Sequence, residues 1–75
     1  MTELEKKKKR NLKRYKAYAQ HRDKAKLTDY YISTHCGVSK ATMSSWKHGE
    51  TTPRVDTLMS ICKLLGVSLE QILVE

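Results

Sequence analysis

The sequence predicts a small all-α fold of five helices, and three observations lead to this prediction. Seventy-five residues are enough for one domain. Apolar side chains recur three or four positions apart, which is the helical period, and no stretch alternates as a strand does. Gly37, Gly49 and Gly66 follow three of these stretches, where a glycine can end a helix in the left-handed conformation.

The first predicted helix runs from Leu12 to about Lys26 and carries a stripe at helical spacing: Leu12, Tyr15, Tyr18 and Ala19. Residues 1–11 before it form a basic arm with five consecutive cations: Lys6, Lys7, Lys8, Lys9 and Arg10. The arm could be helical or frayed, and because these charges repel one another we expect at least partial disorder in the free protein. We therefore divide the chain into the arm and a domain of residues 12–75.

Four shorter helices should follow. Thr28 is a candidate N-cap for the second, whose inward positions are Tyr31, Ile32 and Cys36. Ser39 is a candidate N-cap for the third, from Lys40 to about His48. The fourth follows Pro53 and has an apolar face: Val55, Leu58, Ile61, Cys62 and Leu65. Ser68 and Gln71 form a capping-box pattern that opens the fifth, with Leu69, Ile72 and Leu73 inward.

The second and third helices, joined only through Gly37, Val38 and Ser39, form a helix-turn-helix. On a helical wheel, Met43 and Trp46 share the side that must pack on the core. The opposite side carries Lys40, Ala41, Ser44, Ser45 and His48. Short side chains allow close approach to base edges, where hydroxyls, a lysine and an alanine methyl can all make contacts. This outward face suits a DNA major groove, although an ordinary solvated helix face would have a similar composition.

Charge is divided unevenly along the chain. Residues 1–26 hold eleven Lys or Arg and three acids, a balance of +8, whereas residues 27–75 have a balance of −1. A basic segment of this kind favours a polyanion, with nucleic acid first and an acidic membrane surface second. The alternative interpretation is a solvated tail that keeps the protein in solution.

Several classes of function are not supported by the sequence. The three histidines and two cysteines lack the spacing of a metal site, and no nucleophile–base arrangement or phosphate-binding glycine loop occurs. We therefore expect no enzyme activity, cofactor, metal or small-molecule ligand. There is no signal peptide pattern and no apolar run of the roughly 20 residues that span a bilayer, so we expect a cytoplasmic protein.

The run from Thr28 to Leu73 resembles the phage repressor and Cro type of helix-turn-helix regulator, the XRE-like family. The resemblance depends on an ordered set of features: Ile32 and Ser33 before Gly37, GVSKATMSSW, then Gly49, Pro53 and DTLMSICKLLGVSLEQIL. It implies base contacts from Lys40, Ala41, Ser44 and Ser45. It implies phosphate contacts from Ser39, Thr42, Thr51, Thr52 and Arg54. Members usually bind as two-fold dimers on half-sites about 34 Å apart.

Two positions depart from the family pattern. Asp29 stands where many members have a phosphate-binding Gln, and we expect this acid to serve the helix end instead. Lys47 stands where many have a Glu that pairs with an Arg at the place of Arg22, so that ion pair cannot form. Arg22 then either pairs with another acid or is free for phosphate. Trp46-Lys47 is similar to a variant found in small regulators of mobile elements.

Together these features predict a sequence-specific transcriptional regulator of bacterial, phage or mobile-element type, such as a repressor. Residues 39–48 would enter the major groove of double-stranded DNA, and cations of the basic segment would contact phosphates: Lys6, Lys7, Lys8, Lys9, Arg10, Lys13 and Arg14. We expect a homodimer, formed in solution or only on DNA. The alternative is a protein-interaction module such as an antitoxin, with DNA binding secondary. Membrane binding is disfavoured because the arm has few large apolar residues.

Overall fold

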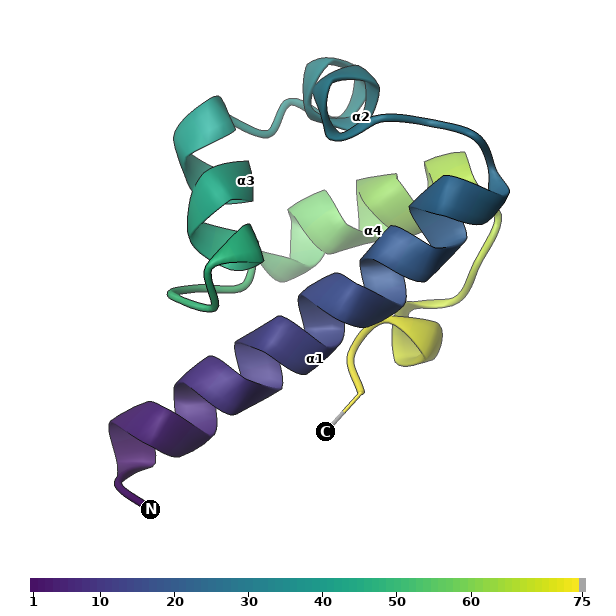
Figure 1. The fold of residues 1–75 in the computed structure, drawn as a ribbon. Helices are drawn as coiled ribbons and strands as arrows, with labels where there is room; N and C mark the ends of the chain where they lie inside the picture. The colour runs from purple at the N-terminus through teal and green to yellow at the C-terminus, as the bar shows by residue number, and fades with distance from the viewer. Residues whose placement is uncertain (75) are drawn as a thin grey trace.

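The computed structural model describes residues 1–74, which form four α-helices and one 3₁₀ helix (Figure 1). Their bounds are α1 Glu3–Lys24, α2 Asp29–Cys36, α3 Lys40–Lys47, α4 Val55–Leu65 and η1 Leu69–Gln71. No strand occurs among these residues. The all-α class is confirmed, but the fifth helix is a single 3₁₀ turn. So short a segment cannot offset the cost of nucleating an α-helix, and 3₁₀ geometry is common in such pieces.

Local signals set the starts and ends of the helices. The hydroxyls of Thr28 and Ser39 accept hydrogen bonds from the backbone N–H groups of Tyr31 and Thr42, both at 3.1 Å, so the predicted N-caps of α2 and α3 are confirmed. Gly37 and Gly66 end α2 and α4 with φ values of 68° and 69°, also as predicted. In the last turn, the Gln71 side chain accepts from the Ser68 N–H at 2.8 Å.

Helix α1 begins at Glu3, well before the predicted start at Leu12. The Thr2 hydroxyl caps it by accepting from the Glu5 N–H at 3.2 Å, and Glu3 and Glu5 place negative charge in its first turn. Lysine also has a good helix propensity, which favours the helix despite the repulsion between the charges. The division drawn between the arm and the domain therefore falls inside one continuous helix.

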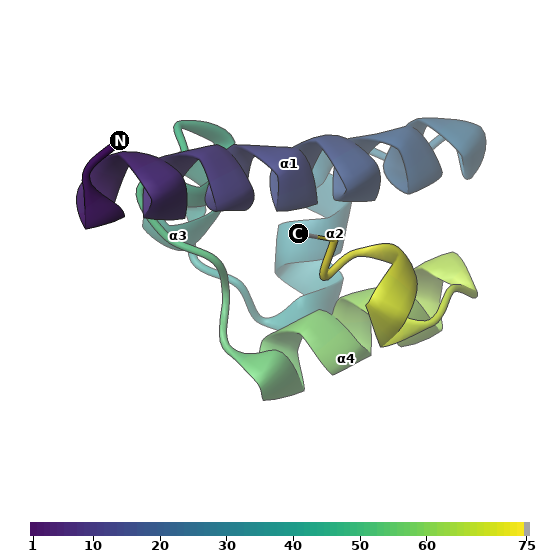
Figure 2. The same cartoon turned by 90° about the horizontal axis from the view of Figure 1, so that it is seen from below.

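The core lies between α1 on one side and α4 on the other, with α2 and α3 connecting them (Figure 2). Its fully buried side chains come from all four α-helices and from the residue that follows η1: Tyr18, Ile32, Trp46, Leu58, Ile61 and Ile72. Three residues predicted to face inward lie at the periphery instead, namely Leu12, Tyr31 and Val55, which are 40%, 39% and 57% exposed. Tyr31 stacks on His35 at 3.9 Å, and Leu12 lies against Gly49 at the edge of the core. The N-terminal turns of α1 project beyond the other helices.

Candidate nucleic-acid interface

The turn between α2 and α3 is tight and fully determined by backbone hydrogen bonds. The carbonyl of Ser33 accepts from the N–H groups of both Gly37 and Val38, the latter at 2.9 Å. Val38 is buried, and Ser39 caps α3 immediately afterwards. The left-handed conformation of Gly37 turns the chain without strain. The angle between α2 and α3 is therefore fixed by the turn itself, which is the geometry of a helix-turn-helix.

Helix α3 has one buried and one open side. Met43 is 5% exposed and Trp46 is fully buried, so these two anchor the helix. Lys40, Ala41 and Ser44 are exposed and Ser45 is half-buried, on the side away from the anchors. The open side thus carries three short side chains between Lys40 at one end and the exposed His48 at the other.

A model of the Cro/C1-type helix-turn-helix DNA-binding domain matches residues 21–74. The chain belongs to this family. Its members bind DNA, so the protein is a DNA-binding regulator in general terms, as the sequence resemblance predicts. Searches against curated proteins and against solved structures gave no match. The first twenty residues, which include most of the lysines of α1, lie outside the matched part of the Cro/C1-type domain.

Helix α3 is held in place by an aromatic cluster between Trp46 and two tyrosines of α1, which precede the matched residues 21–74. The ring of Trp46 lies 4.7 Å from that of Tyr18 and 5.5 Å, edge-on, from that of Tyr15. Both tyrosine hydroxyls donate to the carboxylate of Asp29 in the first turn of α2, each at 2.7 Å. Three helices are thus linked through one carboxylate and three rings.

Arg22 is also part of this cluster, and its contacts show which acids it pairs with when position 47 is a lysine. Its Nη1 donates to Asp29 at 2.7 Å and to the Tyr15 hydroxyl at 3.1 Å, and its Nη2 donates to Asp23 at 2.9 Å. Arg22 therefore pairs with acids and is not left open for a phosphate. Asp29 sits in the first helical turn as expected, but its contacts with the tyrosines were missed. The spacing of Tyr15, Tyr18 and Arg22 along one helix face, with an acid seven residues after the arginine, was the available signal.

The electrostatics of the cluster keep Asp29 ionised and the tyrosines protonated. Burial raises the pKa of Asp29, but the hydrogen bonds from Tyr18, Tyr15 and Arg22 outweigh it and hold that pKa below its ordinary value. Burial, followed by the hydrogen bond to Asp29, raises the pKa values of both Tyr18 and Tyr15. Burial lowers the pKa of Arg22, but its bonds to Asp29, Asp23 and Tyr15 raise it overall.

The predicted phosphate-contacting residues near α3 differ in how far their side chains are already hydrogen-bonded within the protein. The Ser39 hydroxyl donates to that of Thr42 at 2.9 Å, which leaves the Thr42 proton for an outside acceptor. Thr51 is exposed and its hydroxyl donates to the Thr52 carbonyl at 3.3 Å, and the Arg54 side chain is 88% exposed. The Thr52 hydroxyl donates to Asn11 at the shorter distance of 2.6 Å, so its proton is held more firmly. These groups lie at the two ends of α3.

Asn11 connects the loop after α3 to α1. Its Nδ2 donates to the Gly49 carbonyl at 3.1 Å while its Oδ1 accepts from Thr52, and the residue is 5% exposed. A Cβ atom at Gly49 would lie 2.7 Å from Cγ of Leu12 and 3.0 Å from Cγ of Lys8. The loop that would flank a bound duplex therefore rests directly on α1.

A shallow groove of about 310 Å³ runs between the start of α2 and the open side of α3. Tyr30, 69% exposed, forms its rim, and the Lys40 ammonium lies 5.9 Å from the centre of the Tyr30 ring. Lys47 and His48 also line the groove, and His48 Nδ1 is bound to the Ser44 carbonyl at 2.8 Å. Tyr30 was missed by the sequence reasoning, because its place beside Lys40 follows from the interhelical angle and not from a local pattern.

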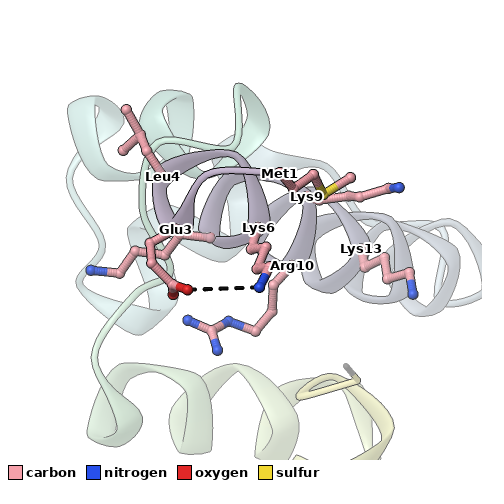
Figure 3. Close-up of a pocket in the computed structure, with 8 residues that line it drawn as sticks. Met1, Glu3, Leu4, Lys6, Lys9, Arg10 and Lys13 are labelled. Atoms are coloured by element: carbon pink, nitrogen blue, oxygen red, sulfur yellow. Dashed lines mark ion pairs between the residues drawn. The ribbon is translucent and has the colours of Figure 1, made fainter.

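The cations predicted to contact phosphates do not form one patch, because α1 distributes them around its axis. Lys8 lies on the side of α1 that faces the loop after α3. Figure 3 shows Leu4 and Arg10 leaving α1 on different sides, with Arg10 directed towards α4. Helical spacing places Lys7 between these two directions and Arg14 on the same side as Arg10. Lys6, Lys9 and Lys13 share the remaining side, which is away from α3.

Proposed function

We propose that this protein is a sequence-specific transcriptional regulator of bacterial, phage or mobile-element type, and that residues 39–48 enter the major groove of double-stranded DNA. The observation that carries this proposal is the open side of α3, where Lys40, Ala41 and Ser44 are exposed while Met43 and Trp46 anchor the helix. A lysine can donate to guanine O6 and N7, serine hydroxyls can donate or accept, and the alanine methyl can touch a thymine methyl. Ser45, half-buried, would contact bases from the edge of this surface.

Phosphates on the two sides of the groove would be held by groups at the two ends of α3. Ser39 and Thr42 are at one end, where the free N–H groups of the helix also favour an anion. Thr51, Thr52 and Arg54 are at the other, with Lys8 of α1 nearby. Thr52 would have to release Asn11 in order to donate to a phosphate. Such contacts position the domain and carry little sequence information.

The protein would act by binding and not by catalysis, as a pair of chains on an inverted repeat. A two-fold operator with half-sites about one helical turn apart is the arrangement usual for helix-turn-helix dimers. The rival interpretation, a protein-interaction module, needs a contiguous exposed apolar patch. On α1, Leu4 is 79% exposed and Met1 near it is 73% exposed, but both stand among lysines, and near η1 Ile72 is buried while Val74 is 37% exposed. Val55 and Met59, each 57% exposed, lie one turn apart on α4. Single exposed apolar residues and small pairs of this kind are ordinary on a protein surface.

Selection of bound fragments from random DNA tests this proposal. The wild-type protein should enrich a common two-fold site. Lys40→Ala/Ser44→Ala should lose or relax the preference at the contacted bases, with a loss of affinity of about 1–3 kcal/mol for each base contact removed. The matched control is Lys63→Ala/Ser60→Ala, which removes an exposed lysine and an exposed serine from α4.

Two results would overturn the proposal. In the first, the α3 variant enriches the same site with unchanged affinity, which would mean that α3 does not read the bases. In the second, no sequence is enriched and all binding disappears when residues 1–14 are removed, which would leave the lysines of α1 as the whole of the DNA-binding activity.

A further inference from the structure

Five lysines form a straight stripe along α1, which we call the α1 ridge: Lys6, Lys9, Lys13, Lys16 and Lys24. Successive members are three or four residues from each other, except that Lys16 and Lys24 are separated by two turns with the exposed Gln20 between them. At about 100° per residue, all of them fall within an arc of about 80° around the helix. Every member is exposed, and Lys9 and Lys13 project together from α1 in Figure 3.

The α1 ridge lies on the side of α1 opposite to α3. The side of α1 that meets α3 is marked by Asn11, Tyr15 and Tyr18, which contact Gly49 and Trp46. The centre of the ridge is about 170° away from these residues around the helix. The open side of α3 in turn faces away from Trp46. The two surfaces therefore point in opposite directions, separated by two helix diameters of about 10 Å each. A straight duplex seated on α3 would not reach the ridge.

The chemistry of the ridge fits a polyanion better than a membrane or a protein groove. Like charges three or four residues apart on a helix destabilise that helix. The ion pair between Lys6 and Glu3, 3.7 Å long, offsets little of this repulsion, because the two side chains are 60% and 95% exposed. The ridge has no large apolar side chain with which to anchor in a bilayer or fill a pocket. It extends for about 27 Å, long enough to meet several phosphates of one duplex.

We propose that the α1 ridge binds the phosphate backbone of a second DNA duplex, so that one chain can bridge two DNA segments. This inference rests on the proposed function for the first duplex, which α3 holds, and for the choice of DNA as the polyanion, because a chain that sits on DNA meets other DNA segments at high local concentration. Binding at the ridge would be independent of sequence and sensitive to salt. Specific reading by α3 and bridging by α1 would then be separable properties of the same molecule.

A two-duplex capture experiment tests this inference. One short duplex, carrying either the selected site or a random sequence, is attached to beads, and a second labelled duplex of random sequence is in solution. The ridge variant is Lys9→Glu/Lys16→Glu. The matched control is Lys26→Glu/Lys63→Glu, which makes the same change of charge at exposed lysines outside the ridge. Protein retained on the beads and labelled duplex recovered with it are measured separately, and thermal unfolding checks that each variant is folded.

Wild-type protein should recover the labelled duplex. The amount of ridge variant retained on the beads with the selected site should be within about threefold of wild type, but the labelled duplex that it recovers should fall by about tenfold or more. The control variant should recover most of the labelled duplex that wild type recovers. Equal recovery by wild type and ridge variant, or no recovery by wild type, would overturn the inference. So would a ridge variant that loses binding to phosphatidylserine vesicles but not to the second duplex. If the proposed function fails instead, Lys40→Ala/Ser44→Ala will leave bead binding unchanged while the ridge variant still loses the second duplex.

Discussion

Asp29 accepts hydrogen bonds from three side chains, and this makes it the residue on which the orientation of the helix-turn-helix most depends. Tyr15 and Tyr18 bring it into contact with the rings around Trp46, and Arg22 neutralises its charge. Only 30% of its side chain is exposed, so these bonds form in a partly dry environment, where charge-assisted bonds are strong. Arg22 is thus paired with Asp29, in a chain where Lys47 cannot form an ion pair with Arg22.

We predict that Asp29→Asn lowers the free energy of unfolding by about 1–3 kcal/mol, because an amide loses the charge and one of the two acceptor oxygens. Asp56→Asn is the matched control, since Asp56 is also an acid in the first turn of a helix but its side chain is 77% exposed. Urea unfolding of both variants measures the effect. A loss for Asp29→Asn no larger than that for Asp56→Asn would show that the cluster contributes no more than an ordinary helix-end charge.

The same carboxylate predicts how stability depends on pH. Its pKa is lower in the folded protein than the value of about 3.9 expected for the unfolded chain. Near and below that value the unfolded state binds more protons than the native state, so this contribution is complete above about pH 5 and is lost as the pH falls through the folded pKa. The difference in unfolding free energy between wild type and Asp29→Asn should therefore be constant above about pH 5 and shrink towards pH 3. A difference that stays constant down to pH 3 would contradict the shifted pKa.

At the scale of the elements, most of the boundaries that neighbouring residues set could be predicted from the sequence. The caps at Thr28 and Ser39 and the glycine stops at 37 and 66 are local, and the structure has all of them. The start of α1 was misplaced because a run of lysines was weighed by its repulsion alone, although the capping Thr2 was visible. The contacts of Asn11 with Gly49 and Thr52 join positions 38 and 41 residues apart, and no local pattern encodes such a distance.

The packing of α1 on the loop after α3 predicts unequal costs for three glycine substitutions. Gly37, Gly49 and Gly66 all have positive φ, so alanine at any of them costs about 1–2 kcal/mol. At Gly49 the new methyl would also meet Leu12 at 2.7 Å, whereas Gly37 and Gly66 have nothing within 4 Å. We expect Gly49→Ala to cost about 1–3 kcal/mol more than the other two.

Thermal unfolding of the three alanine variants measures this difference. Adding Leu12→Ala to Gly49→Ala tests its cause, since removal of the Leu12 Cγ should make the two changes less costly together than their sum. Equal destabilisation by all three single substitutions would mean that α1 and the loop are not in tight contact. Strict additivity in the double variant would place the cost somewhere other than at Leu12.

For the molecule as a whole, positive charge and the proposed reading helix lie in different parts of the chain. The balance of +8 in residues 1–26 comes mainly from α1, whereas α3 lies in residues 27–75, which have a balance of −1. Because α1 packs on α3, the side of α1 from which each cation leaves is set relative to the groove. The side on which a lysine stands should therefore matter more than the total charge of the chain.

This leads to a comparison of two variants with the same net charge. Lys7→Gln/Lys8→Gln removes two cations near the side of α1 that faces α3 and its loop, and Lys9→Gln/Lys16→Gln removes two from the α1 ridge. On a single short duplex with the selected site, the first pair should reduce the slope of log K against log salt by up to about 1.8, since each lost phosphate contact contributes about 0.9. The second pair should reduce it by clearly less, and both should select the same sequence. Equal slopes would show that α1 acts through its net charge alone, whereas a change in the selected sequence would show that Lys7 or Lys8 takes part in reading bases.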